Sequence, residues 1–214
     1  MGPAPAFASV SEAIDMARAA LGYLAAADAA QLAAETQAVC LRGLEQTAAV
    51  ATAARASFLS AFTAGKGYSA DADYSARAWL MHRTGITRGA AASHTAWANR
   101  AGTHPQVVAA LAGGEVSESY ARAICQWTDR LPEKYREESD EFLADAAARG
   151  LGLADLSAMF AEMYERARSE LPDEDPARGF EDRGVRLETT FAATAWNKDK
   201  TKVLHSHGPP VRPG

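Results

Sequence analysis

The stretch DAAQLAAETQAVCLRGLEQTAAVATAARASFLSAFTA (28–64) decides the fold, because apolar and small residues recur in it every three or four positions. That spacing places them on one face of an α-helix. A helix of this length exceeds the usual globular helix and needs a long partner surface. The partner is a first helix, capped by Ser11 and ending near Ala26, that folds back; a second copy of the protein; or both. The residues of the predicted face are Cys40, Leu44, Thr47, Ala51, Ala54, Phe58 and Ala61.

The composition extends the helical prediction to the rest of the chain. Alanine makes up about a quarter of the 214 residues and aromatic residues only 8%. Alanine is the best helix former and a weak strand former, so we expect an all-α fold. We predict a long helical hairpin over 10–64, with Asp28 capping its second helix, a Gly- and Asp-containing linker over 65–75, and a cluster of shorter helices over 76–171.

Three segments of that cluster share one pattern. RTGITRGAAA (83–92), AGGEVSESYA (112–121) and ARGLGLADLS (148–157) each contain a glycine, then an apolar residue, then a helix restart. Glycine ends helices because it accepts the left-handed conformation, and Thr87 and Ser117 are suitable N-caps for the helices that follow. The apolar residues are Ile86, Val116 and Leu151. The pattern predicts compact corners between short helices.

The carboxy-terminal part changes character. Residues 172–194 form a predicted acidic loop followed by a strand-like segment, VRLETTFA (185–192), whose apolar and polar residues alternate. This strand has no partner in an otherwise helical chain. Three of the chain's five lysines fall within 198–202, and a Pro- and Gly-rich run follows. We therefore predict a disordered tail over 195–214.

Charge and sequence composition exclude some classes of function. The net charge of −5 argues against a protein that coats nucleic acid indiscriminately. Residues 74–114 hold four arginines, three histidines and no acid, whereas 133–182 hold fifteen acids against six bases. This asymmetry fits either a local anion-binding surface or ordinary solvated helix faces. No signal peptide or membrane span is present, so we expect a cytoplasmic protein that does not contact a membrane.

Catalytic signatures are absent from the sequence. It contains no G-x-x-x-x-G-K-[ST], G-x-S-x-G or H-E-x-x-H motif. Cys40 and Cys125 lack metal-ligand spacing, so we expect buried, reduced thiols. His205 and His207 lie in the Pro- and Gly-rich tail without further ligands nearby. We therefore predict no enzyme activity, cofactor, metal site or small-molecule substrate.

The stretch MHRTGITRGAAASHTAW (81–97) has two interpretations. A helix-turn-helix needs a tight turn before a second helix that enters the major groove, and Gly85, Ile86 and Thr87 supply such a turn. A packing corner between two helices needs the same residues, and Gly89 and the alanines leave few side chains to contact bases. The residues available to DNA are Arg83, Arg88, Ser93, His94, Asn99 and Arg100.

Four segments in this order resemble a bacterial family, domain of unknown function 222. They are YSARAWLMHRTGITRGAAASHTAWANR, HPQVVAALAGGEVSESYARAI, LPEKYREESDEFLADAAARGLGLADL and DRGVRLETTF, and the resemblance covers about 12–194. In that family the helical region usually precedes an HNH endonuclease domain. The resemblance ends near Thr194, and the HNH pattern is absent, so a truncated or frameshifted gene is the expected explanation.

Three hypotheses of function follow. The first is a non-catalytic helical module of an HNH endonuclease-like protein, with DNA as its partner. The second is a helical module that binds itself or a partner protein through residues 28–64, without DNA contact. The third is a gene remnant without function.

Overall fold

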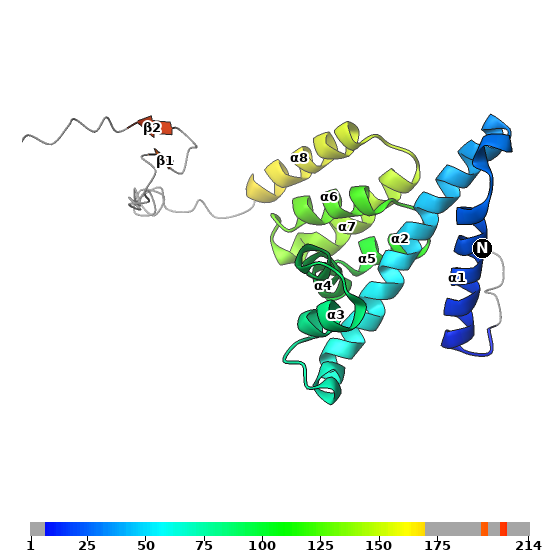
Figure 1. Cartoon of the computed structure of the whole chain (residues 1–214). Coiled ribbons are helices and arrows are strands. Elements are labelled where there is room, and N and C mark those ends of the chain that lie inside the picture. Colours follow the sequence, from blue (N-terminus) through cyan, green and yellow to red (C-terminus); the bar gives the residue numbers. More distant parts are fainter. Residues whose placement is uncertain (1–6, 170–193, 197–201, 205–214) are drawn as a thin grey trace, which may run out of the picture. The chain divides into compact units, whose positions relative to one another are not determined.

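The computed structural model describes residues 7–169, 194–196 and 202–204. These residues form an all-α fold, as predicted, apart from two short paired strands (Figure 1). The chain divides into two compact units, Met1–Met163 and Tyr164–Gly214. The described helices are α1 (Val10–Ala26), η1 (Ala29–Gln31), α2 (Ala34–Ala64), η2 (Gly67–Asp71), α3 (Ala76–Thr84), α4 (Arg88–Thr103), α5 (Pro105–Ala112), α6 (Glu118–Thr128), α7 (Glu133–Ala148) and α8 (Leu153–Ser169), where η marks a 3₁₀ helix.

The predicted hairpin consists of α1 and α2, joined through η1. The cap of α1 is Ser9, whose hydroxyl accepts from the Glu12 N–H at 3.1 Å, so the predicted cap Ser11 is wrong by two residues. Asp28 caps η1 instead of the long helix, which begins at Ala34. The predicted ends of both helices, Ala26 and Ala64, are confirmed.

Helix α2 is the longest described helix and has 31 residues (Figure 1). One of its faces packs against the shorter helices, chiefly α4 and α5. All but one of the buried residues of this face are small, and they allow the backbones to approach closely. They are Ala49, Thr52, Ala53, Ala56 and Leu59.

The predicted linker is packed onto its neighbours. It contains η2, which lies between two non-glycine residues in the left-handed conformation, Lys66 (φ 51°) and Ala72 (φ 61°). The ring of Tyr68 meets that of Phe62 edge to face, with 6.4 Å between ring centroids. Both rings pack on a small cluster formed by Leu59, Ala76 and Ala98. The long helix and the short helices therefore belong to one compact unit.

The predicted corners are confirmed. Gly85 ends α3 with φ 69°, and the Thr87 hydroxyl caps α4 by accepting from the Ala90 N–H at 3.2 Å. Gly114 adopts φ 66°, and the Ser117 hydroxyl caps α6 by accepting from the Tyr120 N–H at 3.3 Å. Of the three apolar residues that follow these glycines, Val116 is fully buried and Ile86 and Leu151 are half-buried.

The core of the short-helix cluster lies among α5, α6, α7 and the first part of α8. Trp127 on α6 stacks on Phe160 on α8 with ring centroids 6.0 Å apart. The largest fully buried apolar side chains of this core are Val107, Leu111, Ile124, Leu143 and Leu156.

The carboxy-terminal predictions fall largely outside the described residues. This holds for the acidic loop and for the strand-like segment 185–192. Two short strands are described, β1 (Thr194–Trp196) and β2 (Lys202–Leu204), and they pair antiparallel with Ala195 opposite Val203. The described residues of the predicted tail (195–214) belong to these two strands, and the rest of the tail lies outside the described residues.

Candidate functional site

The α3–α4 corner positions the residues that sequence reasoning assigned to DNA contact. Helix α4 is a central packing helix, because Ala91, Trp97 and Ala98 are buried and it lies along α2. Its fully exposed positions are few and carry mostly small side chains. They are Arg88, Gly89, Asn99, Gly102 and Thr103.

The structure does not gather the six predicted residues on one surface. Arg88 and Asn99 are eleven residues apart, which places both on the exposed side of α4. Arg83 lies in the last turn of α3 and pairs with Asp71 of η2, its Nη2 lying 2.8 Å from the Asp71 Oδ1. The acid that neutralises Arg83 therefore comes from the predicted linker.

Ser93, His94 and Arg100 are half-buried and turn toward neighbouring side chains. The Ser93 hydroxyl accepts from Arg122 at 3.3 Å, and the Arg100 guanidinium lies 5.0 Å from the centre of the Trp97 ring. Burial lowers the pKa of His94, and the positive charge of Arg55 lowers it further. A neutral, partly buried imidazole is a weak phosphate ligand.

Glu118 joins three helices, a role that the sequence did not indicate. Its carboxylate accepts from the Thr52 hydroxyl of α2 and the Trp97 indole of α4, each at 3.0 Å, and it pairs with Arg122 on its own helix. Burial acts to raise the pKa of Glu118, but these hydrogen bonds bring it below its ordinary value. Glu118 remains charged and holds α2, α4 and α6 together.

His104 forms a second buried polar cluster that sequence reasoning missed. The ring is 1% exposed, and its Nδ1 and Nε2 lie 2.8 Å and 3.0 Å from carboxylate oxygens of Asp140 and Asp129. The Thr128 hydroxyl donates to the other Asp140 oxygen at 2.6 Å. Burial acts to lower the pKa of His104, but the two carboxylates raise it overall. Both His104 ring nitrogens and both Asp140 oxygens are engaged within the protein. This cluster therefore connects helices inside the fold.

The apolar face predicted for the long helix lies opposite the face that packs on the core. We call its seven residues the α2 seam. None of them is buried, and Phe58 is 60% exposed. Helix α1 does not pack along the seam, because α1 has no buried residue and its apolar side chains Val10, Ile14, Leu21 and Leu24 are exposed. Only the end of α1 lies near the seam, where Leu24 lines a pocket together with Cys40 and Leu44. Burial against the first helix, one of the predicted alternatives, is therefore not observed in the described chain.

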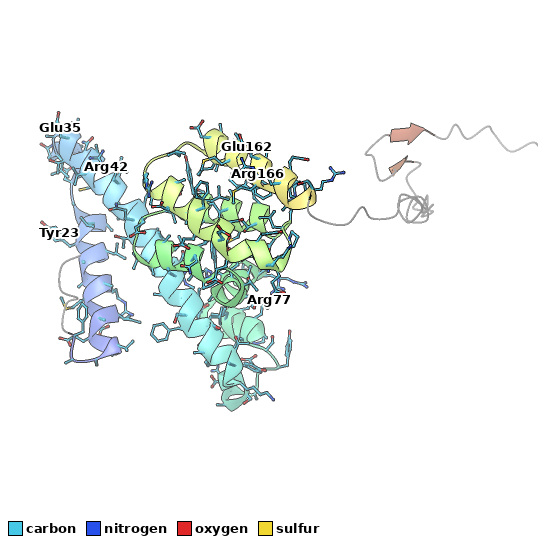
Figure 2. All side chains as sticks on the ribbon, turned by 180° about the vertical axis from the view of Figure 1, so that it is seen from behind. Tyr23, Glu35, Arg42, Arg77, Glu162 and Arg166 are labelled. Carbon is cyan, nitrogen blue, oxygen red and sulfur yellow. The ribbon has the colours of Figure 1, made fainter. Side chains whose placement is uncertain are left out.

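An apolar pocket of about 390 Å³ lies beside the amino-terminal end of the seam. Figure 2 shows Glu35 and Arg42 on this part of α2 and Tyr23 on α1. The end of α1, η1 and the start of α2 all contribute to the pocket wall. The lining residues are Leu24, Ala27, Ala29, Ala30, Leu32, Gln37, Cys40, Leu41 and Leu44.

The two cysteines differ in their surroundings. Cys125 is fully buried, as predicted, and burial raises the pKa of its thiol to about 12. Cys40 is only half-buried, so its predicted burial is wrong; it lies on the seam and lines the apolar pocket beside the end of α1. Both cysteines are free thiols, as predicted.

Residues 7–169, 194–196 and 202–204 contain no group of three or more His, Cys, Asp or Glu side chains that could hold a metal ion. His205 and His207 lie outside these residues. No helix of the described chain is long and apolar enough to cross a membrane.

Comparison with family models, with curated proteins and with solved structures finds no match to this chain. The resemblance to domain of unknown function 222 therefore stays a prediction.

Proposed function

We propose that this chain is a non-catalytic helical module that self-associates, using the α2 seam as its contact surface. The observation that carries the proposal is the exposure of a continuous apolar face opposite the buried face of the same helix. A helix in water that is apolar on two opposite faces needs a partner on each. The short helices cover one face of α2, and a second copy covers the other.

The spacing of the seam supports a helical partner. Its residues follow one another at steps of four, three, four, three, four and three. This alternation is the 3.5-residue repeat by which two helices pack side by side over several turns. The seam contains no charged residue, so pairing leaves no buried, unpaired charge.

The length of the seam favours one kind of partner. From Cys40 to Ala61 it covers 22 residues, about 33 Å at about 1.5 Å per residue. Helix α1 has 17 residues and is too short to pair along all of it. Among the described helices only α2 is long enough, which favours the α2 of a second copy.

Charged substitutions on the seam test this function. Leu44→Asp and Phe58→Asp place a carboxylate in the paired interface, where burial without a counter-charge costs several kcal/mol, and we expect monomers in sedimentation velocity. Val39→Asp is the matched control, because Val39 is on the same helix, 59% exposed and off the seam. The proposal fails if all three variants sediment like the wild type.

A second candidate function is nucleic-acid binding at the start of α4. The Arg77 Nη2 donates to the Arg88 carbonyl oxygen at 3.2 Å, so the two arginines stand together beside the amino-terminus of that helix. Figure 2 shows Arg77 at the side of the short-helix cluster. Within the described residues neither arginine forms an ion pair with an acid, and both remain able to contact phosphate.

DNA binding at this corner is expected to be weak and salt-sensitive, because few cations contact the phosphates. The double variant Arg77→Ala/Arg88→Ala should abolish a gel shift seen at low salt, while Arg149→Ala, at the end of α7, should leave it unchanged. Absence of any shift for the wild type at low salt contradicts this second candidate.

A further inference from the structure

Resting on the proposed self-association, we infer that two chains pair their α2 helices antiparallel about a two-fold axis at Ala51. In this arrangement Phe58 of each copy enters the apolar pocket of the other. The partner of the seam is thus a second copy in one orientation and one register.

The positions of Phe58 and of the pocket fit this symmetry. Phe58 lies seven residues after Ala51, and Leu44, which lines the pocket, lies seven residues before it. A two-fold axis at Ala51 therefore brings Phe58 of one copy opposite Leu44 of the other, at both ends of the interface. Such a contact is isologous and closes on itself.

The pocket and the ring are complementary in chemistry. The pocket wall is apolar apart from Gln37, and Phe58 projects into solvent from an uncharged face. An exposed aromatic ring that enters an apolar pocket is the kind of anchor that dominates the binding energy of an interface. Because the two-fold axis repeats the contact, the interface contains two such anchors.

The middle of the seam allows the helices to approach closely. Between the two Phe58–Leu44 contacts, the antiparallel register places Ala51 opposite Ala51 and brings Ala54 to within one position of Thr47. Side chains of this size bring helix axes to the short end of the usual range of about 8–10 Å, which helps the rings at the ends to reach the pockets.

The distance between ring and pocket along the helix favours the antiparallel orientation. Phe58 and Leu44 are fourteen residues apart, about 21 Å at about 1.5 Å per residue. Parallel pairing in register places Phe58 against Phe58 and leaves both pockets empty. Antiparallel pairing brings each ring to a pocket, and it also sets the positive end of each helix dipole beside the negative end of the other.

Cysteine cross-linking distinguishes the orientations, because Cys40 is a native thiol at one end of the seam. With the two-fold axis at Ala51, Cys40 of one copy lies opposite Phe62 of the other, one position from the seam residue Ala61. We expect Ala61→Cys to form a disulfide-linked dimer under mild oxidation and the wild type to form none. Cys125 does not interfere, since it is fully buried.

The double variant Cys40→Ser/Ala61→Cys is the matched control and should not cross-link in the antiparallel dimer. Parallel pairing predicts the opposite results, with cross-linked dimers of the wild type through Cys40 and of the double variant through its introduced thiol. Those results would overturn the inference while leaving self-association intact. A wild type that stays monomeric would instead overturn the proposed function itself.

A second measurement tests whether the Phe58 ring enters the pocket of the other copy. Phe58→Ala should weaken the dimer about tenfold to a hundredfold, since an aromatic anchor in a pocket carries a large share of binding energy. Phe142→Ala removes a similarly exposed phenyl ring from α7 and should leave the dissociation constant unchanged. Equal affinity of both variants and the wild type would contradict the placement of Phe58 in the pocket.

Discussion

His104 and Asp140 are joined by a buried hydrogen bond in which the ring Nδ1 lies 2.8 Å from the carboxylate Oδ2. The two residues stand at the start of α5 and within α7, 36 positions apart. Asp140 is fully buried, and the Thr128 hydroxyl of α6 engages its other oxygen. This contact therefore links three helices of the core through charged groups that are sheltered from water.

Removal of Asp140 should destabilise the fold strongly. Asp140→Ala leaves the His104 ring and the Thr128 hydroxyl without their partner, and breaking a buried ion pair costs about 3–5 kcal/mol. Asp145→Ala, on the same helix, removes an exposed pair with Arg149 and should cost less than about 1 kcal/mol. Urea denaturation of both variants compares the losses, and similar losses would show that the buried cluster does not stabilise the fold.

The His104 cluster should make stability depend on pH. The pKa of His104 is raised above 6.5 in the folded protein by Asp140 and Asp129, against the effect of burial. Protonation therefore favours folding. The stabilisation is complete below the unfolded pKa, about 6.5, and is lost as pH rises through the higher folded pKa.

The measurement is the difference in melting temperature between the wild type and His104→Gln across a pH range of about 5 to 9, which spans the ordinary histidine pKa. The difference should be largest at the acidic end and shrink as pH rises. A difference that is constant with pH, or that grows with it, would contradict a protonated His104 in the folded protein.

Two glycines near α4 should respond in opposite ways to alanine. Gly85 has φ 69°, a conformation that costs an alanine about 1–2 kcal/mol. Gly85→Ala should therefore destabilise the fold, although a Cβ added there would meet no other atom within 4 Å. Gly102 lies within α4, also with open space, and Gly102→Ala should stabilise by about 0.4–1 kcal/mol. Thermal denaturation of both variants gives the sign of each change in stability. A Gly85→Ala variant more stable than the wild type would contradict the left-handed conformation at this corner.

The corners of the short helices could be predicted because their signals are local. Gly85 followed by Thr87, and Gly114 followed by Ser117, specify a helix end and a helix start within a few residues, and the chain realises both. The predicted start of α2 lies too early, at Asp28 instead of Ala33, because an aspartate can cap a 3₁₀ turn as well as an α-helix.

The burial of α2 could not be predicted from its own period. The seam has a regular spacing of apolar and small residues, yet the core packs on the opposite face, largely through small residues such as Ala53 and Ala56. Small residues give a weak hydrophobic signal, although they permit the closest packing. The hydrogen bonds of His104 and Glu118 could not be predicted for another reason. His104–Asp140 and Thr52–Glu118 join residues that are far apart in sequence.

We propose that the exposed seam of α2 pairs with the seam of a second copy. Sedimentation equilibrium of the wild-type chain over a wide range of concentration tests it most directly. We expect a mass that approaches twice the 22.6 kDa of one chain as concentration rises. A mass of 22.6 kDa at every concentration would contradict it.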